Sequence, residues 1–203
     1  MHPALPHLVI VRHGETPWTL TGQHTGRTDL ELTAAGATSA SRLAALLGDR
    51  SFAKVFTSPL KRARQTADLA GFGAVATPEP DLCEWHYGDY EGLTTAQIRA
   101  QRPDWRLFEH GCPNGETPDA VGARADRVIA KVQAVQAVHA VHAAADNVLL
   151  FAHSDILRVL TARWLRLPAL EGRRVKLDTN SISHLGYDHD LGEPVIRRLN
   201  QAA

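Results

Sequence analysis

The stretch Leu8-Val9-Ile10-Val11-Arg12-His13-Gly14-Glu15-Thr16 decides how this chain folds. Its first four residues are apolar and mostly β-branched, as in a strand that is covered on both faces, and this pattern ends abruptly at Arg12. The residues that follow are charged, small or polar, which is typical of a loop after a buried strand. We therefore expect a central strand that carries Arg12 and His13 at its carboxyl end.

Two further apolar stretches are predicted strands that run into polar residues. The first, residues 54–57, is followed by Ser58-Pro59, which predicts an N-cap and the first turn of a helix. The second, residues 147–152, is followed by His153. Because ligands of parallel sheets bind beyond the carboxyl ends of the strands, we expect these polar groups to gather in one site.

The rest of the chain alternates between strand and helix patterns. Thr33 and Thr117 are positioned to begin helices that carry one apolar face. Shorter strands are expected near residues 74–76, 182–187 and 195–199, the last two as a hairpin. The pattern predicts a single domain over residues 1–203: an α/β fold, arranged as a three-layer α/β/α sandwich whose mostly parallel central sheet has an antiparallel edge strand.

Composition narrows the classes of partner and the location. Lysine plus arginine equals aspartate plus glutamate, at 22 each in 203 residues, so no overall positive charge favours nucleic acid or an anionic membrane. No apolar run approaches the roughly 20 residues of a membrane-spanning helix. Cys83 and Cys112 form no dense cysteine pattern, and the first residues lack a signal-like segment, so we expect a cytoplasmic protein.

The polar residues near the strand ends suit phosphoryl transfer. Arg12 and Arg62 can neutralise phosphate oxygens, because a guanidinium stays charged and binds these oxygens in pairs. Neutral His13 can attack phosphorus, while His153, protonated by the anionic charge around it, can stabilise the transferring group. Glu84, in a long polar loop, can protonate the leaving oxygen if burial or the bound phosphate raises its pKa.

Together these motifs resemble the histidine phosphatase superfamily, which includes the cofactor-dependent phosphoglycerate mutases. The resemblance is carried, in family order, by Arg12-His13-Gly14-Glu15-Thr16, Thr57-Ser58-Pro59-Leu60-Lys61-Arg62-Ala63, Glu84 before Tyr87-Gly88, and Ala152-His153. It implies that His13 becomes phosphorylated and that Glu84 is the proton donor. It also implies that Arg12, Arg62 and His153 bind the phosphoryl group, and that neither a metal nor an organic cofactor takes part.

Within the superfamily, residues 22–26, 84–92 and 111–117 resemble a subgroup that contains sedoheptulose 1,7-bisphosphatase. This resemblance places four side chains around the substrate: Gln23, His24, Tyr87 and Arg158. We expect three more substrate contacts in the matching motifs: Thr25, Ser58 and Ser154. The subgroup usually has Ala-His-Gly-His where this chain has Ala152-His153-Ser154-Asp155. A carboxylate then replaces a group that can be cationic, so a distal second phosphate is expected to bind less well.

The predicted function is therefore hydrolysis of small-molecule phosphate monoesters, with sugar phosphates as candidate substrates. One alternative is a phosphoglycerate mutase. This chain has Thr19 and Trp85 where mutases have asparagine and arginine, and losing groups that bind the substrate carboxylate favours hydrolysis. The other alternative is a phosphate-binding module without turnover, because Ser154-Asp155 departs from the subgroup motif.

Other features of the chain predict less. His139 and His142 have the spacing of metal ligands, but no acidic or cysteine partner is nearby, so we expect exposed helix histidines and no metal. Trp85 and Tyr90 can either line a sugar pocket or pack their loop onto the core. A homodimer through an edge strand is the assembly that the expected sheet suggests.

Overall fold

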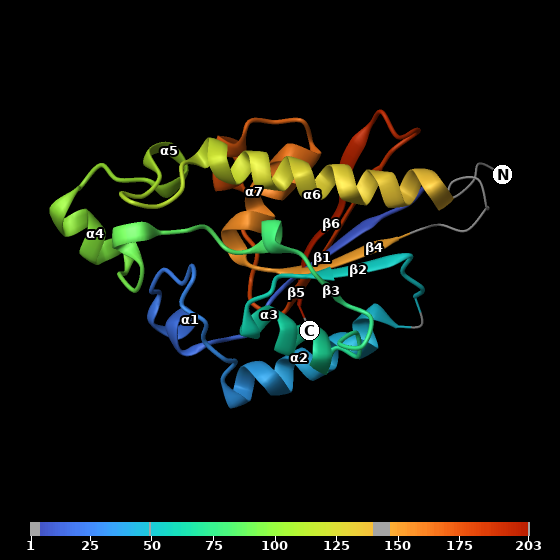
Figure 1. Cartoon of the computed structure of the whole chain (residues 1–203), viewed down its shortest axis with the longest axis horizontal. Helices are drawn as coiled ribbons and strands as arrows, with labels where there is room; N and C mark the ends of the chain where they lie inside the picture. Colours follow the sequence, from blue (N-terminus) through green and yellow to red (C-terminus); the bar gives the residue numbers. More distant parts are fainter. Residues whose placement is uncertain (1–4, 49, 140–146, 203) are drawn as a thin grey trace.

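A mixed six-stranded sheet forms the centre of the protein, with strand order β3-β2-β4-β1-β5-β6 (Figure 1). The computed structural model describes residues 5–48, 50–139 and 147–202. The strands are β1 (Leu8–Arg12), β2 (Lys54–Thr57), β3 (Thr77–Pro78), β4 (Val148–Ala152), β5 (Ser181–Tyr187) and β6 (Pro194–Ala202). Strands β1 to β4 are parallel, whereas β5 is antiparallel to both β1 and β6. The expected mostly parallel sheet with antiparallel pairing at one edge is confirmed.

Helices cover both faces of the sheet. They are α1 (Pro17–Thr21), α2 (Ala34–Leu47), α3 (Lys61–Leu69), α4 (Thr95–Gln101), α5 (Leu107–His110), α6 (Pro118–His139) and α7 (Ser154–Trp164). Helices α6 and α7 lie on one face and α2 and α3 on the other, which gives the expected three layers, while α1, α4 and α5 gather beyond one end of the sheet (Figure 1). Among the described residues, no helix combines the length and apolarity that a membrane crossing needs.

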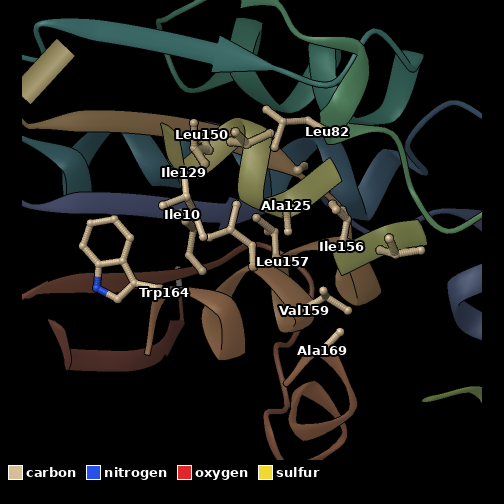
Figure 2. Packing of buried hydrophobic residues seen from close by; sticks show 14 of the residues in the cluster. Ile10, Leu82, Ala125, Ile129, Leu150, Ile156, Leu157, Val159, Trp164 and Ala169 are labelled. Carbon is tan, nitrogen blue, oxygen red and sulfur yellow. The ribbon is translucent and has the colours of Figure 1, made fainter. Parts of the chain in front are cut away.

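The apolar run of β1 is continuous because each of its faces meets a different core. Leu8 and Ile10 pack with α6 and α7, and Figure 2 shows Ile10 among side chains of these helices. Val9 and Val11 face α2 and α3 on the opposite side. These four side chains are at most 1% exposed, and burying each contributes about 1.5–3 kcal/mol. The central strand is thereby fixed, and with it the position of the residues that follow.

The two strand-to-helix junctions differ from each other. Helix α7 begins directly after His153, its N-cap. The expected N-cap role of Ser58 is wrong: Leu60 is extended and is the N-cap, so α3 starts at Lys61. The Ser58 hydroxyl instead accepts the amide of Leu60 at 3.3 Å. This short turn keeps Ser58 at the sheet edge, where its hydroxyl is free to face other groups.

Some local predictions also shift. The short strand lies at Thr77–Pro78 rather than at residues 74–76, because these two residues pair with the end of β2. Thr33 caps α2 as predicted, accepting the amide of Gly36. His142 and the side chain of His139 lie outside the described residues, so their expected exposure stays a prediction.

Candidate active site

His13 is held at the end of β1 with one ring nitrogen occupied. Its backbone amide donates to Ala152 at 2.9 Å, which continues the β1–β4 pairing, and its side chain is buried. Nδ1 lies 2.7 Å from the carbonyl of Gly14. A carbonyl only accepts, so Nδ1 carries the proton and Nε2 is left as the free base. Burial, together with the charges of Arg62 and Arg12, lowers the His13 pKa well below its ordinary value, so the ring is neutral.

His153 lies beside His13 because β4 neighbours β1, with 5.0 Å between the ring centroids. Arg62 Nε donates to His153 Nδ1 at 3.0 Å, and His153 Nε2 lies 2.7 Å from the Ser58 hydroxyl. A guanidinium only donates, so Nδ1 accepts and Nε2 carries the proton. Burial and the Arg62 charge lower the pKa of His153 well below its ordinary value. The ring is therefore a neutral donor in the substrate-free site, whereas the sequence suggested a protonated one.

Arg62 is fully buried and anchored by backbone carbonyls. Its Nη1 donates to Thr28 at 3.0 Å, and its Nη2 donates to Thr25 at 3.0 Å and Gly26 at 2.9 Å. The loop is also packed against the Glu84 loop, and this requires glycine at residue 26: a Cβ there would lie 2.5 Å from the carbonyl of Trp85. The loop thus fixes the guanidinium, and a second N–H of Nη1 has no acceptor in the described part of the chain.

The positive charges of Arg12 and Arg62 are not neutralised by ion pairs. Within the described residues, neither guanidinium has a carboxylate at ion-pair distance. Arg12 Nη1 donates to the carbonyl of Leu177, while its buried Nε has no partner among these residues. Buried donors in proteins are almost always paired, and buried charge is costly when uncompensated. Glu84 and other carboxylates offset part of this charge without direct contact. An unsatisfied donor and two guanidinium groups without a direct ion pair, both beside His13, indicate an anion site.

Glu84 faces the start of α7. Its Oε1 accepts the amides of Trp85 and Ile156, both at 2.9 Å, and its two oxygens share the amide of Asp155 at 3.1 and 3.0 Å. Burial and the Asp155 carboxylate raise the pKa of Glu84 to about 7, against these hydrogen bonds. A carboxyl group with such a pKa can donate and take back a proton near neutral pH.

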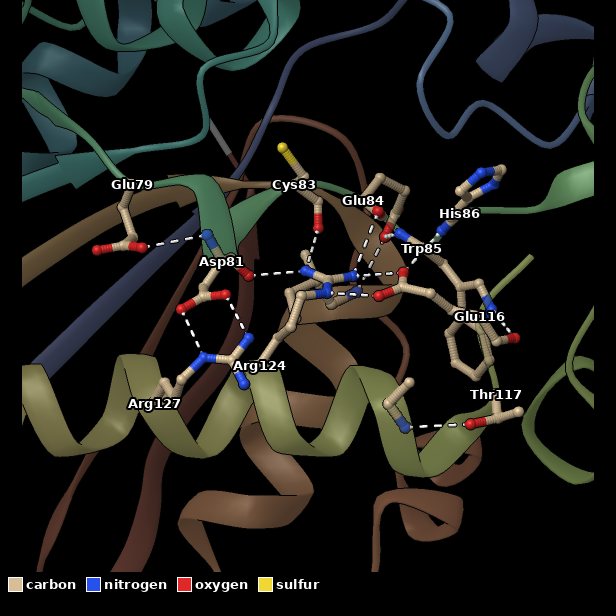
Figure 3. A network of polar contacts seen from close by, with 12 residues as sticks. Glu79, Asp81, Cys83, Glu84, Trp85, His86, Glu116, Thr117, Arg124 and Arg127 are labelled. Atoms are coloured by element: carbon tan, nitrogen blue, oxygen red, sulfur yellow. Dashed lines mark hydrogen bonds and ion pairs between the residues drawn. The ribbon is translucent and has the colours of Figure 1, made fainter. Parts of the chain in front are cut away.

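The loop that carries Glu84 is clamped from behind by Arg124 of α6 (Figure 3). Arg124 Nη1 donates to the carbonyls of Asp81 and Cys83 at 2.7 and 2.8 Å. Its Nε and Nη2 bind the Glu116 carboxylate, both at 2.7 Å, and Glu116 also accepts the amide of His86. The clamp fixes the backbone on both sides of Glu84. This contact could not be predicted from the sequence, because no spacing connects Arg124 to a loop some 40 residues earlier.

Asp155 connects the catalytic centre to its surroundings. The Tyr87 hydroxyl donates to Oδ2 at 2.7 Å, and Arg158 Nη1 donates to Oδ1 at 2.6 Å. The Arg158 guanidinium in turn lies 4.4 Å from the ring centroid of Phe108. The carboxylate that departs from the subgroup motif is therefore paired, so its repulsion toward a substrate anion is partly offset.

A cavity of about 440 Å³ opens next to Asp155. His24, Trp105 and Phe108 supply rings to its lining, and His24 also lies 4.7 Å from the Tyr87 ring. Its charged lining residues are Arg99, Arg106, Glu109, Asp155, Arg158 and Arg173. The cavity has the mixed aromatic and polar lining of a small-molecule site.

The predicted substrate-binding residues fall into three groups. His24 and Arg158 line the cavity, while Tyr87 and Ser58 contact residues of the catalytic centre. The others are Gln23, whose amide donates to Gly92, Thr25, whose carbonyl holds Arg62, and Ser154, the partly buried first residue of α7.

The contacts of Trp85 and Tyr90 indicate whether these rings line a pocket or pack their loop onto the core. Trp85 is 0% exposed and donates its indole N–H to Glu116, so it packs the loop onto the core. Tyr90 packs edge-on against Trp105, at 5.2 Å between centroids. Trp105 and Phe108 line the cavity and were not predicted, because an aromatic residue in a loop and another in a short helix carry no signal that separates lining from core.

The chain is similar to a family of known proteins. The model of the "Histidine phosphatase superfamily (branch 1)" matches residues 8–202. An acid phosphatase of Mycobacterium tuberculosis is 41% identical over 186 residues, covering 91% of this chain and 88% of the relative. Sedoheptulose 1,7-bisphosphatase of Saccharomyces cerevisiae is 38% identical, covering 80% of this chain and 68% of the relative. A solved structure of an open reading frame product of M. tuberculosis, 39% identical, superposes with a TM-score of 0.87 over 97% of this chain and 98% of the other.

Proposed function

We propose, from the premise that this chain belongs to the histidine phosphatase superfamily (branch 1), that His13 is the nucleophile of a two-step hydrolysis. The protein is an enzyme of that superfamily and acts as a phosphatase on phosphate monoesters. The observation that carries the assignment of His13 is its fixed tautomer. Gly14 holds the proton on Nδ1, and the ring lies in the positive field of Arg62 and Arg12, which have no direct ion pair in the described part of the chain.

In the first step, the Nε2 lone pair of His13 attacks phosphorus and the bond to the ester oxygen breaks. Glu84 gives its proton to that oxygen, so an alcohol leaves and Glu84 becomes a carboxylate. The phosphorylated ring is cationic, and the Gly14 carbonyl stabilises its Nδ1–H. Arg12 and Arg62 bind the phosphoryl oxygens, and the Nε2–H of His153 turns to them from the Ser58 hydroxyl, which it faces at 2.7 Å. This places positive or donor groups where negative charge develops.

In the second step, water attacks phosphorus and the P–Nε2 bond breaks. The Glu84 carboxylate takes the proton of the attacking water, which restores the acid for the next cycle. Inorganic phosphate and neutral His13 result. A pKa of about 7 suits both halves of this cycle, because Glu84 must be an acid in one step and a base in the other.

The substrate we propose is a small sugar phosphate. The cavity beside Asp155 holds a leaving group of that size, and its aromatic and arginine side chains suit a hydroxylated, charged molecule. Sedoheptulose bisphosphatase is among the relatives, which supports the same class. Pairing of Asp155 with Tyr87 and Arg158 also reduces the expected penalty for a second phosphate. Rates on matched sugar mono- and bisphosphates test this: equal rates on an aryl phosphate and on every sugar phosphate would contradict it.

Trapping the intermediate tests the assignment of His13. Brief reaction with a ³²P-labelled phosphate ester, followed by quenching, should leave acid-labile, base-stable label on the wild-type protein. His13→Ala should carry no label and should hydrolyse an aryl phosphate at least about 10³-fold more slowly. His184→Ala, a histidine on β5, is the matched control and should label normally. Unchanged turnover in His13→Ala would refute the assignment.

The same experiments address the two alternatives. Hydrolysis of an aryl phosphate that depends on His13 excludes a binding module without turnover. With 2- and 3-phosphoglycerate, a phosphatase releases inorganic phosphate faster than it interconverts the two isomers, and a mutase does the reverse.

Location and assembly complete the proposal. Both cysteines, Cys83 and Cys112, are free thiols, which supports a cytoplasmic enzyme. A homodimer through an edge strand of the sheet remains the assembly we propose, and the mass of the protein in solution by light scattering tests it.

A further inference from the structure

A second group of histidines and arginines lies at the other end of β1. We name it the basic pocket and define it by five residues: His7, Arg50, His184, Arg197 and Arg198. They line a cavity of about 390 Å³. His7 directly precedes β1, and the six residues from it to His13 span about 20 Å of extended chain. The basic pocket is therefore separate from the catalytic centre.

The topology of the sheet brings these residues together from distant parts of the sequence. His184 on β5 lies opposite Val9 on β1 and opposite Arg198 on β6. Residues opposite each other on neighbouring strands point to the same face, so His184 and Arg198 share the face that Val9 presents to α2 and α3. Arg50 reaches the same cavity from the connection between α2 and β2.

The positive charges of the basic pocket are poorly compensated. Within residues 5–48, 50–139 and 147–202, the carboxylate at ion-pair distance from one of these arginines is Asp188, 3.8 Å from Arg197. Arg50 contacts His184 Nε2 at 3.4 Å, and Arg198 donates to the neutral amide of Gln201 at 2.9 Å. Arg197 Nη2 also donates to the carbonyl of Tyr187. Three arginines and two imidazoles thus line one cavity.

The positive charge of the arginines helps to lower the pKa values of the two histidines. Burial, with the charges of Arg50, His7 and Arg198, lowers the pKa of His184 to about 4. Burial, with Arg197 and Arg50, also lowers the pKa of His7. Among the described residues, the charged neighbours that lower these two pKa values are Arg50, Arg197 and Arg198, and His7 acts on His184 in the same direction. An anion in the cavity would reverse the sign of that field and would pair with arginines that now repel each other.

We propose that the basic pocket is a second anion site, which binds a phosphate-type dianion in the form of inorganic phosphate or the phosphate group of a small molecule. The cavity favours this class because arginines on two sides can donate to tetrahedral oxygens in pairs. Its concave shape and modest volume suit a small ligand rather than an extended polyanion such as nucleic acid. The inference does not depend on the roles of His13 or Glu84.

The test follows the imidazole C–H signal of His184 by NMR in the full-length enzyme, assigned with His184→Gln. Inorganic phosphate and methylphosphonate, a stable mimic of a phosphate monoester, are titrated separately at constant ionic strength and pH 8, where both are mostly dianions. Because the readout is local, phosphate bound at the catalytic centre does not obscure it. Saturable displacement of the signal is expected, and the tighter of the two probes identifies whether the free ion or a monoester is preferred.

Variants decide whether the response comes from a built site. Arg50→Gln/Arg198→Gln should weaken phosphate binding by at least about tenfold, because paired guanidinium contacts are lost. Arg42→Gln/Arg64→Gln removes the same charge from exposed arginines that do not line the basic pocket, and it should bind like the wild type. The proposal is overturned if His184 shows no saturable response to either probe. It is equally overturned if both double variants respond like the wild type.

Discussion

Histidines and arginines gather at both ends of β1, but their arrangement differs between the two. At the carboxyl end, His13 and His153 are buried, and each ring has one nitrogen fixed by a carbonyl or a guanidinium. At the amino end, His184 is also buried, but Arg197 and Arg198 are exposed on an edge strand with few partners. The difference teaches that catalysis needs donors fixed before the substrate arrives, whereas binding a small anion needs only charge and access.

Removing one arginine from each end should expose this contrast most strongly. Arg62→Gln should lower kcat by about 10²–10³-fold, because it removes a buried, oriented charge from the phosphoryl group. Arg198→Gln should stay within about twofold, because an exposed arginine far from the reaction adds little to it. Steady-state rates on an aryl phosphate measure both. Thermal unfolding of each variant checks that Arg62→Gln is folded. Comparable losses of kcat in the two variants would contradict the difference between the two ends of β1.

The clamp behind Glu84 offers a comparison within the catalytic end. Arg124→Ala should lower kcat by roughly 10–100-fold, because Glu84 moves out of line when its loop loosens. Arg127→Ala removes the neighbouring bidentate pair with Asp81 on the exposed side of α6, and it should change kcat by less than about twofold.

The readout that separates positioning from general destabilisation is the pH profile of the Arg124 variant. The limb assigned to Glu84 should shift, because the surroundings of its carboxyl group change. A loss of activity with an unchanged limb, or a loss that Arg124→Lys fails to recover in part, would argue against a positioning role for Arg124.

Asp155 should set the pH range of the enzyme. In the mechanism that we propose, Glu84 must be protonated to act as an acid, so kcat/KM should fall as pH rises through about 7. Asp155→Asn removes a carboxylate that raises the Glu84 pKa, so this descending limb should move to lower pH. A fall of about one pKa unit would reduce kcat/KM roughly tenfold on the alkaline side.

Two comparisons make the Asp155 result specific. The second ionisation of the substrate is the same for both enzymes, so the difference between their profiles reports the protein. Tyr87→Phe removes the hydrogen bond that Tyr87 donates to Asp155 but keeps the negative charge of Asp155. The descending limb of its pH profile should therefore not move to lower pH. Identical profiles for Asp155→Asn and the wild type would show that Asp155 does not influence Glu84.

The smallest expected effect concerns stability at the amino end. Arg50→Gln/Arg198→Gln should raise the free energy of unfolding by about 0.5 kcal/mol at low ionic strength, because it relieves repulsion among exposed charges. The gain should vanish in concentrated salt or saturating phosphate. Urea unfolding measures it, with Arg42→Gln/Arg64→Gln as the control. Destabilisation at low salt would mean that these arginines are held by attractive contacts instead.

Much of the fold was predictable because its signals are local. The apolar run of β1 and the residues just after it specify a buried strand that ends in Arg12 and His13, and the structure agrees. Short elements were missed, as with α1 and α5, since a few residues carry too little periodicity to predict a helix. The shift at Ser58 has the same origin: Pro59 allows a helix to start, but contacts decide where it does.

The sequence by itself determined which chemical groups meet at the carboxyl edge of the sheet, because strand patterns and polar strand ends are local properties of the chain. Only the tertiary structure decided how those groups behave. The neutral tautomer of His153, the raised pKa of Glu84 and the Arg124 clamp depend on partners that the fold brings from distant residues. The basic pocket likewise exists only once residues 7, 50, 184, 197 and 198 surround one cavity. Protonation and orientation depend on burial and nearby charge, and burial and proximity are set by packing in three dimensions.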